Sequence, residues 1–169
     1  MKVDFHSHIL PYMDDGSRDA EMTSKMLKME KRSGVLLTAL TSHYYESEES
    51  VGEFLKRREG AFSALMEVYN EKEMPSIILG AEVEMYKGMS DDDLSGLCLG
   101  DTNLLLCEMP SSFDDYISDE LSELVCRGFV PLVAHFERYF PVYKEKEISE
   151  IADVEGCIYQ INIMVLMVI

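Results

Sequence analysis

Residues 3–16 read "VDFHSHILPYMDDG", and this stretch decides the fold. It begins as a short apolar strand and leads directly into His6 and His8, two of only four histidines in the chain. Side chains two residues apart on a strand point the same way, so both imidazoles are able to meet one cation. The stretch therefore predicts a strand with reactive side chains at its carboxyl end.

Apolar runs of strand length recur along the chain and alternate with longer stretches of helical spacing. The apolar runs are residues 2–5, 35–40, 77–79, 104–107 and 130–134. The helical stretches are about 19–34, with Met22, Met26, Leu27 and Met29 expected to face inward, about 51–72 and about 112–128. Repeated β-α units of this kind usually give a parallel sheet, either open or closed into a barrel. We therefore predict an α/β fold in a single domain over residues 1–169.

Titratable side chains follow each predicted strand. In parallel α/β proteins the loops after the strands share one face, and reactive groups cluster there. His43 ends the second run in "TALTSHYY", and Glu82 follows the third in "LGAEVEM". Glu108 follows the fourth in "LLLCEMP". His135 follows the fifth in "PLVAHFERY", with Arg138 just beyond it, so that all four histidines fall at strand ends.

Such a cluster indicates a metal site, because a buried carboxylate is costly without a partner and several together are normally neutralised by metal ions. A mixed set of nitrogen and oxygen ligands suits Mn²⁺, Fe²⁺ or Zn²⁺, and the share of carboxylates favours manganese. Two or three such ions would bind a phosphate and generate a hydroxide for in-line attack. In the loop after the first strand, Asp14 and Asp15 could add a ligand, and Gly16 permits a tight turn.

Two acidic residues of these motifs are weaker candidates. Glu84 shares a face with Glu82, but we assign it to solvent or to the surroundings of the ligands. Asp14 stays in reserve, because one of two adjacent aspartates often bonds the backbone of its own turn.

The composition excludes several classes of protein. With 15 basic and 32 acidic residues the net charge is −17, which repels polyanions, so we expect no nucleic-acid partner. The longest uncharged apolar run, residues 157–169, is shorter than the ~20 residues of a transmembrane helix, and we expect no membrane insertion. The four cysteines form no C-x-x-C pair and the chain starts without a signal-peptide pattern, so we expect a cytoplasmic protein with reduced thiols.

The successive motifs resemble those of the PHP (polymerase and histidinol phosphatase) superfamily, and within it the bacterial manganese-dependent tyrosine-protein phosphatases of capsule and exopolysaccharide synthesis. The motifs are "DFHSHILPYMDDG", "TSHYY", "GAEVEM", "LLLCEMP", "VAHFERY" and "YQIN", in the family's order over residues 1–162. The resemblance implies a distorted (β/α) barrel, two or three metal ions and hydrolysis of phosphotyrosine on a partner tyrosine kinase. It implies Arg138 as the phosphate-binding arginine and, as metal ligands, His6, His8, Asp15, His43, Glu82, Glu108 and His135.

The chain departs from the family pattern at its carboxyl end. Family members continue past the "QIN" strand and supply a further Asp-x-His pair to the metal site, whereas this chain ends at Ile169 with the apolar residues "IMVLMVI". We therefore expect a truncated member with an incomplete barrel, one or more weakly held metal ions, and an exposed sheet edge that invites association. The oligomeric state stays open.

Three functions are compatible with these residues. The first is metal-dependent hydrolysis of phosphotyrosine, with hydroxide generated at the metal as nucleophile and Arg138 stabilising charge on the phosphate. The second is a small-molecule phosphoesterase of the histidinol-phosphatase type, because the metal cluster alone does not choose the leaving group. The third is a catalytically impaired remnant, because lost ligands lower both metal affinity and rate. A cysteine-based phosphatase is disfavoured, since no Cys-x₅-Arg loop occurs.

Overall fold

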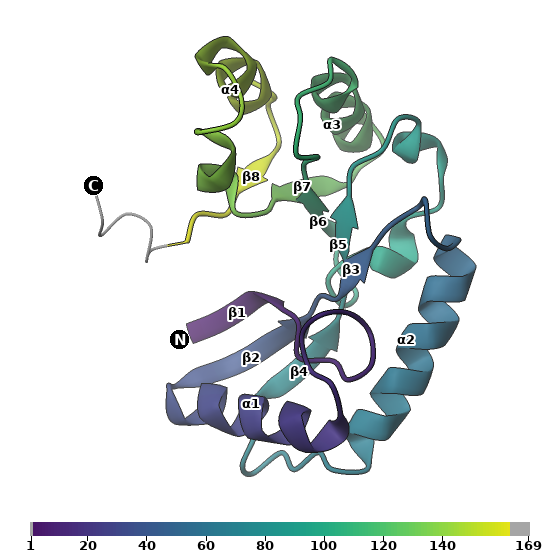
Figure 1. The fold of residues 1–169 in the computed structure, drawn as a ribbon, viewed down its shortest axis with the longest axis vertical. Helices are drawn as coiled ribbons and strands as arrows, with labels where there is room; N and C mark the ends of the chain where they lie inside the picture. The colour runs from purple at the N-terminus through teal and green to yellow at the C-terminus, as the bar shows by residue number, and fades with distance from the viewer. Residues whose placement is uncertain (1, 163–169) are drawn as a thin grey trace.

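The computed structural model describes residues 2–162, in which strands and helices alternate as the sequence predicts (Figure 1). The strands are β1 (Lys2–Ser7), β2 (Val35–Leu40), β3 (His43–Tyr44), β4 (Ser76–Leu79), β5 (Glu82–Glu84), β6 (Leu104–Glu108), β7 (Val130–Val133) and β8 (Ile158–Tyr159). The α-helices are α1 (Ala20–Arg32), α2 (Val51–Met66), α3 (Tyr116–Cys126) and α4 (Glu145–Ala152). Short 3₁₀ helices are η1 (Met89–Asp91), η2 (Ser95–Leu97) and η3 (Phe136–Tyr139).

Two parallel sheets, in the orders β1-β2-β4 and β3-β5-β6-β7-β8, continue into one another. The chain runs from β2 directly into β3 and from β4 directly into β5, strands that Figure 1 labels near the middle of the molecule. Backbone hydrogen bonds bridge both transitions: the N–H of Gly80 donates to the carbonyl of Leu40, and the N–H of Glu82 donates to that of Ser42, each at 3.1 Å. The two sheets are therefore halves of one curved parallel surface.

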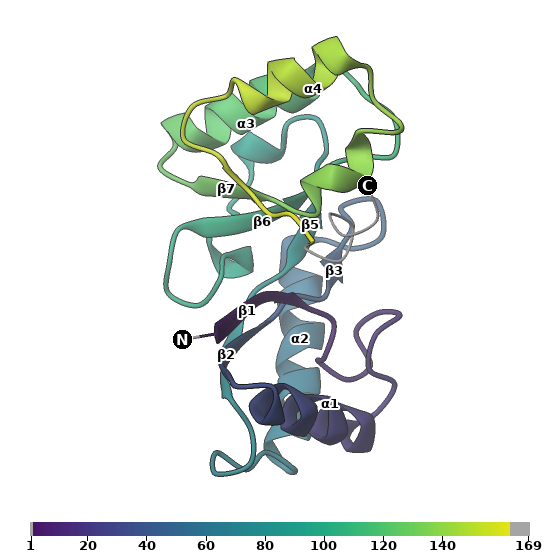
Figure 2. The same cartoon turned by 90° about the vertical axis from the view of Figure 1, so that its left-hand side faces the viewer.

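This curved surface confirms the predicted α/β class and has the strand order of a barrel that is not closed. Among the described strands, β1 pairs only with β2 and β8 pairs only with β7. Helices α1 and α2 cover the half that contains β1, β2 and β4, while α3 and α4 lie over the other half (Figures 1 and 2). The expectation for the apolar tail falls on residues 163–169, which lie outside the described residues.

The first two helices begin and end at signals in the sequence. Asp19 caps α1 by accepting the N–H of Met22 at 2.8 Å, and Gly34 follows the helix with φ +86°, a conformation that favours glycine. Ser50 and Glu53 form a reciprocal capping box at the start of α2. These contacts fix where the connecting segments leave the sheet.

The predicted inward face of α1 was partly wrong. Met22 and Met29 are 38% and 64% exposed, whereas Thr23 and Leu27 are fully buried. The hydroxyl of Thr23 donates to the carbonyl of Ile9 at 2.7 Å, which satisfies this polar group inside the core. The buried face of the helix therefore includes a polar residue with a tertiary hydrogen bond, which hydrophobicity alone does not indicate.

Two helices are shorter than predicted. Helix α2 ends at Met66 because the chain turns back there: Asn70 accepts a backbone N–H through its side chain, and the Tyr69 hydroxyl donates to the carbonyl of Pro75 at 2.9 Å. Helix α3 begins at Tyr116 rather than near residue 112.

No helix in the described part of the chain combines the length and the apolarity that crossing a bilayer requires.

Candidate metal centre

One cavity of about 340 Å³ opens at the carboxyl ends of the strands, and all seven side chains predicted as ligands line it. They are His6, His8, Asp15, His43, Glu82, Glu108 and His135. Arg138, Gln160 and Asn162 complete the lining. The topology thus brings together residues that lie more than a hundred positions apart in the sequence.

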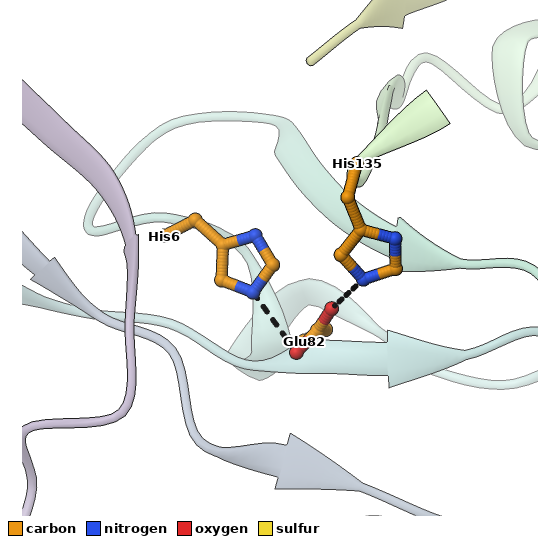
Figure 3. A group of neighbouring side chains, drawn as sticks. All are labelled: His6, Glu82 and His135. Carbon is orange, nitrogen blue, oxygen red and sulfur yellow. Dashed lines mark hydrogen bonds and ion pairs between the residues drawn. The ribbon is translucent and has the colours of Figure 1, made fainter. Parts of the chain in front are cut away.

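Glu82 lies at the centre of this cluster and is only 1% exposed. Its Oε2 atom lies 3.0 Å from His6 Nε2, 3.1 Å from His8 Nε2 and 3.2 Å from His43 Nδ1. Its Oε1 atom lies 2.9 Å from His135 Nε2. Figure 3 shows the imidazoles of His6 and His135 facing this carboxylate from two sides. One buried carboxylate is therefore shared by all four histidines.

The second carboxylate of the cluster belongs to Glu108, at the end of β6. It lies 3.4 Å from His43 Nδ1 and 3.5 Å from His135 Nε2, so it faces two of the same imidazoles. Asp15 is exposed at the rim of the cavity. Glu84, which we assigned to the surroundings, lines an adjoining cavity instead.

Asp14 does more than bond its own turn. Its Oδ1 accepts the N–H of Gly16, and its Oδ2 accepts the N–H of His43, both at 3.0 Å. Because Oδ2 is an acceptor, His8 Nδ1, at 2.8 Å from it, must donate, and His8 Nε2 is left to face the cavity. Gly16 is required for a reason that the sequence did not reveal: a Cβ atom there would lie 2.0 Å from the carbonyl oxygen of His8.

Gln160, directly after β8, is a residue of the site to which the sequence assigned no role. Its Oε1 accepts the backbone N–H of His135 at 3.0 Å, so this atom must be the amide oxygen. His6 Nδ1, at 2.9 Å from the same oxygen, is therefore a donor, and its Nε2 points at Glu82. The bond also holds the backbone of His135, which has a φ of +34° that residues other than glycine rarely adopt.

The electrostatics follow from these contacts. Burial alone would lower the pKa of His8, but the hydrogen bond to Asp14 and the contact with Glu82 raise it to about 10. Burial likewise opposes the charge on His135, but Glu108 and Glu82 raise its pKa to about 9. Although burial disfavours ionisation of Glu108, the adjacent imidazoles lower its pKa to about 2. Without metal, His8 and His135 thus hold protons that a divalent cation would replace.

The donor atoms fit a divalent metal ion. His6 Nε2 and His8 Nε2 lie 3.3 Å apart, and because each ring donates from Nδ1, both Nε2 atoms are free to offer a lone pair to one cation once it displaces their protons. Within residues 2–162, the buried atoms Glu82 Oε2 and His43 Nδ1 have no aligned hydrogen-bond partner. Three groups have ligand atoms within 4.8 Å of one another: His6-Glu82-His135, His8-His43-Glu82 and His8-Asp14-Asp15. Imidazole and carboxylate donors suit Mn²⁺, Fe²⁺ or Zn²⁺.

Arg138 adds a positive charge at the edge of the cavity. Its side chain is exposed, and in the described part of the chain it forms no ion pair. Its neighbour Glu137 instead accepts the backbone N–H of Asn162 at 3.2 Å and its side-chain Nδ2 at 2.9 Å. The guanidinium group is therefore available to an anion in the cavity.

The fold and the cluster define the class: a parallel α/β protein with a cavity of histidine and carboxylate ligands at the carboxyl ends of its strands. Within that class, the chain belongs to the CpsB/CapC family of capsular polysaccharide synthesis, which matches residues 2–168. This match confirms the family that the motifs indicated.

Named relatives agree with the family. The chain is 30% identical over 144 residues to the tyrosine-protein phosphatase YwqE of Bacillus subtilis strain 168, with 80% of this chain and 54% of YwqE covered. It is 32% identical over 175 residues to the tyrosine-protein phosphatase CpsB of Streptococcus pneumoniae, with 95% of this chain and 67% of CpsB covered. It thus spans about half to two thirds of the length of these relatives.

A crystal structure supports the fold. It comes from work on YwqE of Bacillus subtilis and CpsB of Streptococcus pneumoniae, described as unique metal-dependent tyrosine phosphatases. It matches with a TM-score of 0.72 at 24% identity and covers 94% of this chain and 65% of that chain. The two proteins share the same curved parallel architecture.

Proposed function

We propose that this domain is a metal-dependent phosphatase that removes phosphate from tyrosine in a protein, with a bacterial tyrosine kinase of capsule or exopolysaccharide synthesis as its substrate. The observation that carries the proposal is the buried Glu82, shared by four imidazoles, beside an Arg138 that has no ion-pair partner among the described residues. The tyrosine-phosphatase names of YwqE and CpsB support the same activity. The proposed metal is Mn²⁺, held by the seven ligands that line the cavity.

The residues of this chain have separate tasks in that reaction. Bound divalent ions supply Lewis acidity and ease the deprotonation of water. Asp14 and Gln160 hold His8 and His6 in the tautomers that direct Nε2 into the cavity. Arg138 binds the equatorial oxygens of the phosphate and stabilises the charge that develops on them. The oxygen of water bonds to phosphorus, the bond from phosphorus to the phenolic oxygen breaks, and a proton passes to the released tyrosine.

The cysteines support this assignment. None of them lines the cavity, and Cys98 and Cys107 are buried. Burial raises the pKa of Cys107, which keeps that thiol protonated and unreactive. The four thiols form no disulfide, which is typical of the cytoplasm and supports a cytoplasmic location as part of the proposal.

Turnover of a phosphotyrosyl peptide tests the proposed function. We expect release of phosphate to require added Mn²⁺, to stop with a chelator, and to persist after alkylation of the thiols. Alkylation should modify Cys126, the exposed cysteine, so a Cys126→Ser variant is the matched control. Loss on alkylation together with indifference to the chelator would contradict the proposal.

Two further readouts separate the alternative functions. Faster hydrolysis of histidinol phosphate than of the peptide would indicate a small-molecule phosphoesterase. Full metal occupancy without turnover of either substrate would indicate a remnant that only binds metal.

A further inference from the structure

A second cavity, of about 350 Å³, adjoins the metal centre and shares three lining residues with it. The shared residues are Glu108, His135 and Arg138. The guanidinium group of Arg138 therefore stands at the boundary of both cavities. An ester group that extends past Arg138 from a phosphate at the metal centre would enter this second cavity.

One wall of the second cavity is the ring of Tyr45, which follows β3. Its ring stacks on that of His43, with centroids 5.2 Å apart and an angle of 20° between the planes. The ring is half-buried, so its orientation is fixed while part of it stays accessible. A ligand ring in the cavity would meet a preformed aromatic surface.

Tyr139 and Met109 also line the second cavity. The hydroxyl of Tyr139 donates to the carbonyl of Met109 at 3.1 Å and accepts its N–H at 3.0 Å. The ring of Tyr143 packs 5.3 Å from that of Tyr139. Because the hydroxyl of Tyr139 makes both of these bonds, its ring is held beside Met109 and presents apolar atoms to the cavity.

Val142 lines the same cavity and is 60% exposed. Its side chain therefore contributes little to the core and leaves an apolar surface exposed next to the metal centre. Glu84 and the exposed Ser111 add to the polar part of the lining, together with the three residues shared with the metal centre. The lining thus combines apolar and aromatic walls with a polar rim, as small-molecule pockets typically do.

We propose that this second cavity, the ring subsite lined by Tyr45, Met109, Tyr139 and Val142, binds the aromatic ring of the phosphorylated residue and selects aryl over alkyl phosphate esters. The inference rests on the proposed function for the placement of the phosphate. An ester of serine or a small alcohol has no ring to fill the ring subsite and leaves its walls in water. A phosphotyrosyl side chain buries its ring there while Arg138 holds the phosphate.

Binding of two phosphonates tests the ring subsite without turnover. Benzylphosphonate has a carbon atom where phenyl phosphate has its ester oxygen, and ethylphosphonate lacks the ring; neither is hydrolysed. Calorimetry on the Mn²⁺-loaded chain should show benzylphosphonate binding about tenfold more tightly, as expected for burial of one ring. In Val142→Ser this ratio of affinities should fall about threefold, since part of the apolar wall is lost, and in Val142→Leu it should be retained.

The matched control is Val68→Ser, at a valine that is 37% exposed and lies outside both cavities, and it should keep the ratio of the natural chain. Equal affinities for the two phosphonates in the natural chain would overturn the ring subsite, as would an unchanged ratio in Val142→Ser. Failure of the proposed function looks different: the phosphotyrosyl peptide would not be hydrolysed, whichever phosphonate binds more tightly.

Discussion

Replacement of Gln160 by leucine should weaken the metal centre without touching a metal ligand. Leucine has a similar size but removes the acceptor of two hydrogen bonds, from His6 Nδ1 at 2.9 Å and from the N–H of His135 at 3.0 Å. The lost bond of His6 Nδ1 and the N–H of His135, left buried without an acceptor, together lower the free energy of unfolding by about 2–3 kcal/mol. Loss of a partner that orients a ligand typically lowers metal affinity by about 10–100-fold.

Three measurements follow this change. Urea unfolding gives the loss of stability, titration calorimetry with Mn²⁺ gives the affinity, and ¹⁵N NMR of the metal-free chain reports the tautomer of His6. Gln160→Glu keeps an acceptor for both donors and should retain the tautomer that the leucine variant loses. Ile158→Ser, on the exposed side of β8, is the control for a change in the strand alone. Natural Mn²⁺ affinity in Gln160→Leu, with an unaltered His6 spectrum, would refute the reasoning.

Three other variants give separable results. Glu82→Gln removes the charge shared by the histidines and should reduce Mn²⁺ affinity by about 100-fold or more, measured by calorimetry, because a ligand is lost rather than its support. Arg138→Lys should lower kcat/KM for a phosphotyrosyl peptide by about tenfold or more at unchanged metal content, since an ammonium cannot form the two parallel bonds of a guanidinium. Burial and the adjacent Asp4 raise the pKa of Glu30 from 4.5 to about 7 in the folded chain. The protonated side chain therefore stabilises the fold fully below pH 4.5, and this contribution to the free energy of unfolding is lost as pH rises through about 7. Glu30→Gln should therefore be more stable than the natural chain by about 1–2 kcal/mol in urea unfolding near pH 8, after allowance for partial exposure, and the gain should vanish near pH 4.

The apolar runs predicted β1, β2, β4, β6 and β7, and the convergence of the candidate ligands, for one physical reason. The candidate ligands come after apolar runs of strand length, and parallel strands place the residues at their carboxyl ends along one edge of the sheet. That reasoning needs only local patterns and one topological rule. It therefore placed His6 on β1 and His135 after β7 in one cavity, across 128 intervening residues.

What the sequence did not predict depends on tertiary contacts. Gln160 bonds to a ring 154 positions away, and no periodicity reveals such a pair. Asp14 was kept in reserve as a residue that bonds its own turn, whereas it also bonds His8 and accepts the N–H of His43, a contact that forms only once the loop after β1 lies beside β3. Thr23 is buried on α1 and bonded to the carbonyl of Ile9, whereas Met22 and Met29 are exposed against the hydrophobic pattern. In each case a specific polar partner, not a propensity, decided the structure.

The metal centre proposed here depends on one buried carboxylate, Glu82, and on the imidazoles around it. An anomalous-difference map from crystals grown with Mn²⁺ would locate the ion. We expect at least one strong peak within about 2.3 Å of Glu82 and of the Nε2 atom of His6 or His8. Manganese bound only at surface carboxylates, with no peak beside Glu82, would contradict it.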